Sequence, residues 1–209
     1  MLSKTARILE EGGLAALPTD TSWSLVCSLK SKAGIKKLKS LSGERDERHF
    51  TLLCSDISQF GDLCSIDNTR FCLIKRLSPG PYVFILKTLA GTEKTLDIRR
   101  REVGVRIPDH PVPKALIQLL AHPLYSITAK QSMKSDAEAD YRNHEEHDTE
   151  LPPIPQEDLF EGGWELDEIE GVDIILDSGE DRERIFSTIL DLSGDEIKLL
   201  RRGLGPWPV

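Results

Sequence analysis

The sequence lacks the signatures of several large protein classes. It has no apolar run near the roughly 18–20 residues that a membrane-spanning helix needs. It has no glycine-rich P-loop, no G-x-G-x-x-G fingerprint and no G-x-S-x-G nucleophile elbow. These absences exclude the commonest phosphate cradles and the serine hydrolases as first interpretations. The N-terminal residues have a helical pattern without an apolar signal core, so we expect a cytoplasmic protein.

Cysteine pairs and a metal motif are also missing. The four cysteines form no C-x-x-C pair and each has apolar neighbours, so we predict reduced thiols in the core. The segment His144-Glu145-Glu146-His147 places two histidines and two glutamates together. It lies in a predicted loop without the i, i+4 spacing of helical zinc motifs, so we predict no metal site.

Acidic charge is concentrated in one segment. At 209 residues and 39% hydrophobic composition, the chain suits one domain, residues 1–209, with an acidic insertion at about 135–170. The insertion carries 14 acidic residues and Arg142 alone as a basic one, a net charge of −13 that leaves +5 on the remainder. We interpret it as a loop followed by an amphipathic helix at 157–169. It either closes the mouth of a cleft electrostatically or is a solvated excursion.

Helical and strand patterns alternate along the rest of the chain. Apolar spacing and glycine stops predict helices at residues 3–11, 32–41 and 113–122, and Asp56 and Asp67 are expected to cap two more. Apolar and β-branched runs predict strands at 14–17, 23–29, 50–54, 82–86, 103–107, 124–128, 172–176, 185–192 and 197–200. This order predicts an α/β fold, a twisted mixed sheet with helices packed on it.

Two places stand out as candidate binding sites. Pro18-Thr19-Asp20-Thr21 follows a buried strand, where ligands collect in α/β sheets, although the same residues suit a capping turn. Arg106 ends a strand, and a desolvated arginine there binds either a phosphate or carboxylate ligand or a structural carboxylate.

Basic residues form two clusters on the remainder of the chain. One is the triplet Arg99, Arg100 and Arg101, and the other includes Lys36 and Lys37 on a predicted helix. Both are candidates for contacts with an RNA backbone, and a solvated basic face is the alternative.

Six ordered blocks of sequence carry a resemblance to a known family. They are GGLAALPTDTSWSLVCS, SPGPYVFILK, VGVRIPDHPVPKAL, GVDIILDSG, FSTILDL and IKLLRRG. Together they resemble the YrdC/YciO family over nearly the whole chain. RHFTLLCSD and SIDNTRFCLIKRLSPGPYVFILK resemble its YciO branch.

The resemblance implies a fold, a chemistry and a set of site residues. The family fold is a twisted α/β sheet with a positively charged concave surface. Its best-known members are threonylcarbamoyl-AMP synthases, which join L-threonine, bicarbonate and ATP, with magnesium expected beside ATP, during tRNA modification. Members are also described as binding double-stranded RNA. The matching substrate positions are Thr21, Arg106, Thr128 and Ser187, and the nucleotide positions are Arg48, Lys130 and Arg201.

The sequence departs from the synthase pattern at three places. Ser42 and Glu44 stand where synthases carry a Lys-x-Arg pair, and Trp23 replaces the usual tyrosine. The Ser-Ala-Asn motif becomes Thr128-Ala129-Lys130. Each lost cation–phosphate contact removes roughly 1.5–3 kcal/mol. We therefore expect weak or absent synthase activity.

These observations lead to one favoured hypothesis and one rival. The favoured hypothesis is a YciO-like protein that binds a nucleotide, a threonylcarbamoyl compound or the modified tRNA. The rival is a non-catalytic module for double-stranded RNA. A small-molecule pocket around Thr21 and Thr128 would favour the first hypothesis, and a broad basic surface without a pocket would favour the second.

Overall fold

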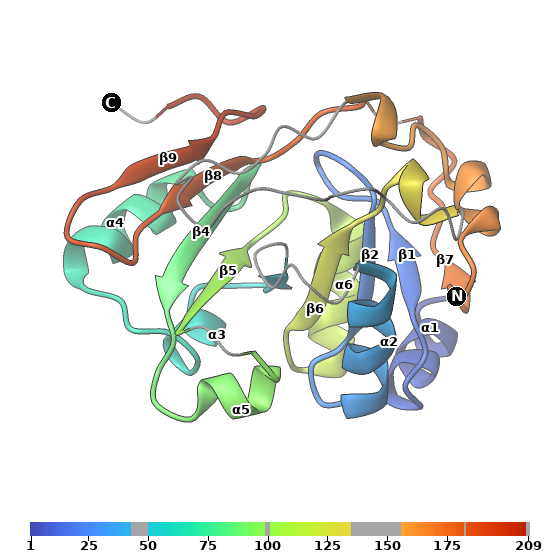
Figure 1. Ribbon diagram of the computed structural model, residues 1–209, viewed down its shortest axis with the longest axis horizontal. Helices are drawn as coiled ribbons and strands as arrows, with labels where there is room; N and C mark the ends of the chain where they lie inside the picture. The colour runs from blue at the N-terminus through green and yellow to red at the C-terminus, as the bar shows by residue number, and fades with distance from the viewer. Residues whose placement is uncertain (43–49, 99–100, 135–155, 182, 208–209) are drawn as a thin grey trace, which may run out of the picture.

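Nine strands join into one mixed sheet in the computed structural model, which describes residues 1–42, 50–98, 101–134, 156–181 and 183–207 (Figure 1). The strand order is β7-β1-β2-β6-β3-β5-β4-β8-β9. Three neighbouring pairs are parallel, namely β1 with β7, β3 with β5 and β4 with β8, and the others are antiparallel. The strands are β1 Ala15–Leu17, β2 Ser24–Ser28, β3 Thr51–Leu53, β4 Tyr82–Lys87, β5 Glu102–Arg106, β6 Leu124–Thr128, β7 Ile174–Ile175, β8 Thr188–Asp191 and β9 Lys198–Arg201.

Helices pack on both faces of this sheet. Successive side chains of a strand point to opposite faces, so Leu14 and Ala16 join one apolar cluster while Ala15 and Leu17 join the other. The first cluster includes apolar residues of α2, and the second those of α1 and α6, which contact each other. The helices are α1 Leu2–Glu10, α2 Lys32–Ser42, α3 Ser58–Gly61, α4 Asn68–Leu77, α5 Thr92–Leu96 and α6 Pro111–Leu120. The expected mixed α/β sheet with flanking helices is thereby confirmed.

The two expected helix caps have different outcomes. Asp67 is the N-cap of α4, and its carboxylate accepts a hydrogen bond from the backbone N–H of Arg70. Asp56 lies one residue before the N-cap of α3 and accepts from the backbone N–H of Ser58. The short helix α5 was not predicted, because five residues carry too little periodicity to be recognised.

The prediction of an amphipathic helix at residues 157–169 is wrong. The structure has two 3₁₀ turns there, η3 Gln156–Asp158 and η4 Gly163–Glu168. Gly162 is the N-cap of η4 and Gly163 its first residue, and glycine inside a helix costs roughly 1 kcal/mol relative to alanine. A Cβ on Gly163 would meet the side chain of Asp177, which would have to shift.

The cysteine prediction is correct for three of the four thiols. Cys27, Cys54 and Cys64 are buried and free. Cys72 is free but exposed. It lies on the face of α4 opposite Ile74, the buried residue of this helix. Burial raises the pKa of Cys27 and of Cys64 to about 12, so both stay protonated at neutral pH.

Within the described ranges, no helix is both long and apolar enough to cross a bilayer. Nor do those ranges contain a group of three or more His, Cys, Asp and Glu side chains that could hold a metal ion. The segment His144–His147 lies outside the described residues.

Candidate functional site

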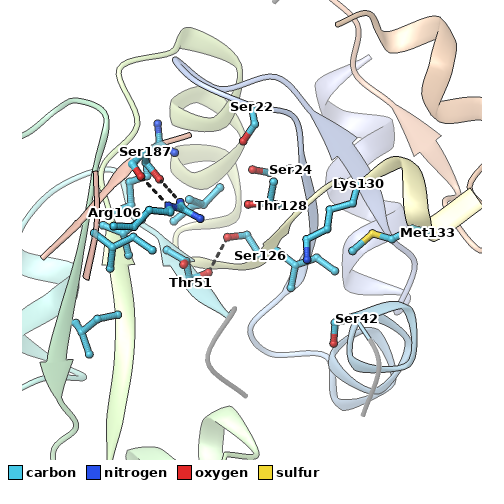
Figure 2. A pocket seen from close by; sticks show the side chains of 16 residues that line it. Ser22, Ser24, Ser42, Thr51, Arg106, Ser126, Thr128, Lys130, Met133 and Ser187 are labelled. Carbon is cyan, nitrogen blue, oxygen red and sulfur yellow. Dashed lines mark hydrogen bonds between the residues drawn. The ribbon is translucent and has the colours of Figure 1, made fainter. Parts of the chain in front are cut away.

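A polar pocket lies over the middle of the sheet, where strands from both halves of the chain meet (Figure 2). Its volume is about 50 Å³. One water needs roughly 10–15 Å³ of such space, so the hollow admits a group of a few heavy atoms. None of the described lining residues is Asp or Glu. They are Ser22, Ser24, Ser42, Thr51, Leu53, Val83, Ile85, Arg106, Ser126, Ile127, Thr128, Lys130, Met133, Ser187, Ile189 and Arg201.

Arg106 reaches the pocket from the end of β5, between β3 and β4. It is only 4% exposed, and its guanidinium donates to Thr21 Oγ1 (Nη1, 2.9 Å) and to Asp20 Oδ1 (Nη2, 2.6 Å). Burial lowers the pKa of Arg106, and the carboxylate of Asp20 acts in the opposite direction. Its Nε–H is buried and has no hydrogen-bond partner among the described residues. Arg106 is thus held at one end and retains an unused donor.

The turn at residues 18–21 has a structural role that explains this arrangement. Thr19 Oγ1 donates to the carbonyl of Ser22 (2.7 Å) and accepts from the backbone N–H of Thr21 (3.1 Å). Asp20 and Thr21 then face Arg106. Thr21 is 2% exposed and is not one of the lining residues, so it lies behind the arginine. The segment thus forms a turn that fixes Arg106, and a direct role of these residues in ligand binding stays a prediction.

Arg201, the last residue of β9, contributes a second guanidinium. It donates to the carbonyl of Ser187 (Nε, 3.1 Å) and to Ser187 Oγ (Nη2, 3.3 Å), and it stacks over the ring of Phe186 at 4.7 Å. Burial, together with the nearby charge of Arg106, lowers the pKa of Arg201 to about 10. We call Arg106, Arg201 and Ser187 the guanidinium wall. Two cations this close favour an anion between or beside them.

The opposite side of the pocket has a different composition. Figure 2 shows Lys130 and Met133 across from Arg106, with Ser42 at the end of α2 nearby. We call Ser42, Lys130 and Met133 the rim. Ser42 Oγ donates to the carbonyl of Lys39 (2.8 Å), which is a bond within its own helix.

Of the hydroxyl groups between these two sides, the sequence analysis named Thr128 and missed Ser24, Thr51 and Ser126. Ser24 is paired with Thr128 across β2 and β6, and Thr51 with Ser126 across β3 and β6. Ser126 Oγ donates to the carbonyl of Thr51 (2.7 Å). The available signal was polar residues spaced by two in buried strands, as at Ser126 and Thr128, because such residues share one face.

The predicted site residues fall into three groups. The pocket brings together five of them: Arg106, Thr128, Lys130, Ser187 and Arg201. Thr21 supports the pocket from behind, and Arg48 lies outside the described residues, as does Glu44.

Of the predicted RNA-binding residues, the three that the structure describes, Lys36, Lys37 and Arg101, do not line this pocket. Arg99 and Arg100 lie outside the described residues, and Arg101 lines a second, more open hollow of about 430 Å³ with Glu93. Lys36 and Lys37 lie on the exposed side of α2. The Nζ atom of Lys37 is 3.9 Å from Oδ2 of Asp173.

The acidic insertion is described only from residue 156 onward. Its described part packs beside the strands of the pocket, with Phe160, Leu166 and Ile169 in the main core. The indole Nε1 of Trp23 donates to the carbonyl of Glu161 (3.3 Å), so the segment is bonded to the residue that precedes β2.

The mixed sheet and the cation-lined pocket define an α/β protein suited to binding anionic groups. The family model Sua5_yciO_yrdC, described as "Telomere recombination", matches residues 7–152. The chain therefore belongs to the Sua5/YciO/YrdC family, as the sequence blocks indicated.

Individual relatives agree with this assignment. The chain is 27% identical to the "Uncharacterized protein YciO" of Escherichia coli over 98% of this chain and 90% of that one. It is 26% identical to the Homo sapiens "Threonylcarbamoyl-AMP synthase", over 88% of this chain and 60% of that one. The crystal structure of E. coli YciO matches with a TM-score of 0.74 at 24% identity, covering 98% of this chain and 90% of that one. P. abyssi Sua5 complexed with L-threonine matches with a TM-score of 0.76 at 24% identity, covering 97% and 54%.

Proposed function

We propose that this chain binds a nucleotide, a threonylcarbamoyl compound or the modified tRNA that carries one, in relation to threonylcarbamoyladenosine modification of tRNA. The observation that carries the proposal is the convergence of Arg106 and Arg201 on one small pocket whose described lining has no carboxylate. Their guanidinium groups are planar donors that match phosphate and carboxylate oxygens. The relatives named as threonylcarbamoyl-AMP synthases supply the context.

The size of the pocket favours a ligand that inserts only one end. About 50 Å³ accommodates a carboxylate or phosphate but not a whole nucleotide. The hydroxyls of Thr128 and Ser187 can donate the remaining hydrogen bonds to such a group. The bulk of the ligand then lies on the open side of the pocket, an arrangement that suits a modified nucleoside still attached to RNA.

An ATP ligand with magnesium fits this site only in part. Arg106, Arg201 and Lys130 suit phosphate oxygens. Magnesium is usually bound through one or two carboxylates together with phosphates and water, and no described lining residue offers a carboxylate. A magnesium ion would thus have to rely on the phosphates. The residues favour the phosphate end of a nucleotide over a metal-dependent triphosphate site.

The chemistry available to these side chains is positioning and charge stabilisation. The cations can orient and neutralise an acyl phosphate or carbamate, with no covalent nucleophile required. Because Ser42 occupies the position of a synthase lysine, its hydroxyl supplies no charge to a triphosphate. We therefore infer binding with weak or absent threonylcarbamoyl-AMP synthesis.

The test is calorimetry with matched ligands. N6-threonylcarbamoyladenosine should bind and adenosine should not, because only the former carries the carboxylate. Arg201→Gln should weaken that binding at least tenfold, whereas Arg202→Gln, the exposed neighbour, should leave it unchanged. The proposal would be contradicted if the two nucleosides bound with equal affinity and Arg201→Gln left that affinity unchanged.

Binding of double-stranded RNA tests the rival function, that of a non-catalytic RNA-binding module. If RNA binds with an affinity that Arg201→Gln leaves intact and Lys36→Glu with Lys37→Glu abolishes, the basic face of α2 is the functional surface. Such binding should fall steeply with salt because counterions are released.

A further inference from the structure

Met133, one residue of the rim, lies on a short turn with little hydrogen bonding of its own. The 3₁₀ turn η2, Gln131–Lys134, follows β6 directly, and Met133 from this turn lines the pocket. None of its four residues is buried. Its own bond runs from the Met133 N–H to the Lys130 carbonyl (3.0 Å). Isolated 3₁₀ turns are short and have poor hydrogen-bond geometry, so contacts from elsewhere must fix this one.

Those contacts come from the acidic insertion. Gln131 Nε2 donates to Glu165 Oε2 at 2.7 Å. The backbone N–H and the hydroxyl of Ser132 donate to the carboxylate of Asp158 at 2.8 and 3.1 Å. Lys134 pairs with Glu168 at 3.0 Å. Three of the four turn residues are thus bonded to carboxylates of the insertion.

Glu165 is the most firmly held of these carboxylates. It is 8% exposed, and its Oε1 accepts from the backbone N–H groups of Glu161 (2.8 Å) and Gly162 (3.1 Å). Burial raises the pKa of Glu165. The two backbone hydrogen bonds, the one from Gln131 and the charge of Lys134 lower it, and together they outweigh burial, so the pKa lies below the usual value. The side chain therefore ties η2 to the backbone of the insertion as a carboxylate.

The insertion is itself anchored in the core. Phe160 and Leu166 are fully buried in the main apolar cluster. The ammonium of Lys134 also makes a cation–π contact with Phe160, 5.1 Å from the ring centroid. The Trp23 indole bonds the carbonyl of Glu161. The contacts thus run without interruption from the core through residues 158–168 to the rim.

We propose that residues 156–170 are a brace for the ligand pocket and that Glu165 is its main positioning residue, holding η2 so that Met133 forms one side of the pocket. The inference rests on the proposed function for its effect on ligands, because a brace matters to binding only if the pocket binds. It also assigns the carboxylates of Asp158, Glu165 and Glu168 to the turn. They are satisfied by protein donors, in contrast to an electrostatic gate made of free charges.

Met133 provides a direct measurement of this brace. The chain has two methionines, and Met1 is 80% exposed. Methyl-labelled protein therefore gives two resonances, of which the sharp, solvent-like one belongs to Met1. In Glu165→Ala the Met133 resonance should move toward the solvent-like position and sharpen. Glu165→Gln should largely preserve it, since an amide oxygen can still accept from the backbone and Gln131 can turn its amide to match.

The affinity for N6-threonylcarbamoyladenosine should follow the same order. We expect a loss of about tenfold in Glu165→Ala, a smaller loss in Glu165→Gln and none in Glu170→Gln, which removes an exposed charge from the same segment. Calorimetry and circular dichroism on the full chain measure affinity and folding together. If Glu165→Ala unfolds the protein, Gln131→Leu removes the same contact from the turn side and should reproduce the Met133 change.

The outcomes separate the two inferences. A Met133 resonance and affinity that stay unchanged in folded Glu165→Ala or Gln131→Leu protein overturn the brace. A Met133 resonance that responds while the wild-type protein binds none of the ligands supports the brace and overturns the proposed function. An equal change in Glu170→Gln also overturns the brace, because bulk charge would then explain it.

Discussion

The two sides of the pocket are built in different ways. The guanidinium wall is part of the sheet: Arg106 ends a central strand, and Arg201 is bonded to Ser187 beside β8. Of the rim, Met133 lies on the turn η2, which is held by carboxylates of the acidic insertion. Arg106 and Arg201 therefore lie in paired strands, whereas Met133 lies on a turn outside the sheet. We infer that anion binding belongs to the wall and that ligand selectivity is set mainly at the rim.

The largest effect is expected from breaking the wall at Arg106. Arg106→Ala leaves the Asp20 carboxylate, which is mostly buried, without its partner, and breaking such a pair costs about 3–5 kcal/mol. Urea denaturation should show this loss, and calorimetry should detect no ligand binding. The double variant Arg106→Met with Asp20→Asn should recover most of the stability but none of the affinity. Recovered binding in the double variant would argue against a role for the guanidinium.

Arg201 should affect binding more than folding. Its hydrogen bonds to Ser187 are partly exposed, so Arg201→Gln should change the unfolding midpoint little. The lost charge-assisted contact to a ligand anion is worth about 1.5–3 kcal/mol, a factor of roughly 10 to 100 in affinity. Arg201→Lys should restore part of it because the charge remains while the fork is lost. Identical affinities for the Gln and Lys variants would mean that the charge is not used.

A change at the rim should alter which ligand is preferred. Ser42→Lys adds a cation on the side of the pocket opposite Arg106, so we expect ATP to bind about tenfold more tightly than in the wild type. Ser40→Lys adds the same charge to an exposed position of α2 and is the control. Wild-type protein should release little or no pyrophosphate in the presence of L-threonine and bicarbonate. Wild-type turnover at the rate of a synthase would overturn the expectation drawn from Ser42.

Acid should weaken the brace. The folded-state pKa of Glu165 lies below the usual value of 4.5. Its stabilising effect is therefore fully present above pH 4.5 and is lost as the pH falls through the lower folded-state value. Wild-type protein should lose more stability between pH 6 and pH 3 than Glu165→Gln, which has no carboxylate to protonate. Parallel pH profiles for the two proteins would show that Glu165 contributes nothing.

The sequence was sufficient to predict the sheet and most cations of the pocket. The apolar runs revealed the strands, and Arg106 was recognisable because an arginine that ends a buried strand needs a partner. Its partners were not deducible as such, since Asp20 and Thr21 lie 86 and 85 residues away in the chain. The contacts of the acidic insertion were missed for the same reason. Its composition suggested solvated charge, and only tertiary structure pairs Glu165 with Gln131.

The indole of Trp23 is an intrinsic fluorescence probe for the contact between the sheet and the insertion. Trp23 is fully buried and bonded to Glu161, whereas Trp164 is 72% exposed and Trp207 is 37% exposed. We therefore expect the emission spectrum to contain one blue-shifted, quencher-resistant component, which arises from Trp23 at the junction between sheet and insertion. Replacing Trp164 and Trp207 with phenylalanine isolates that component. Its wavelength and its resistance to acrylamide then report, in real time and without any label, whether the insertion remains seated when a ligand, acid or denaturant is added.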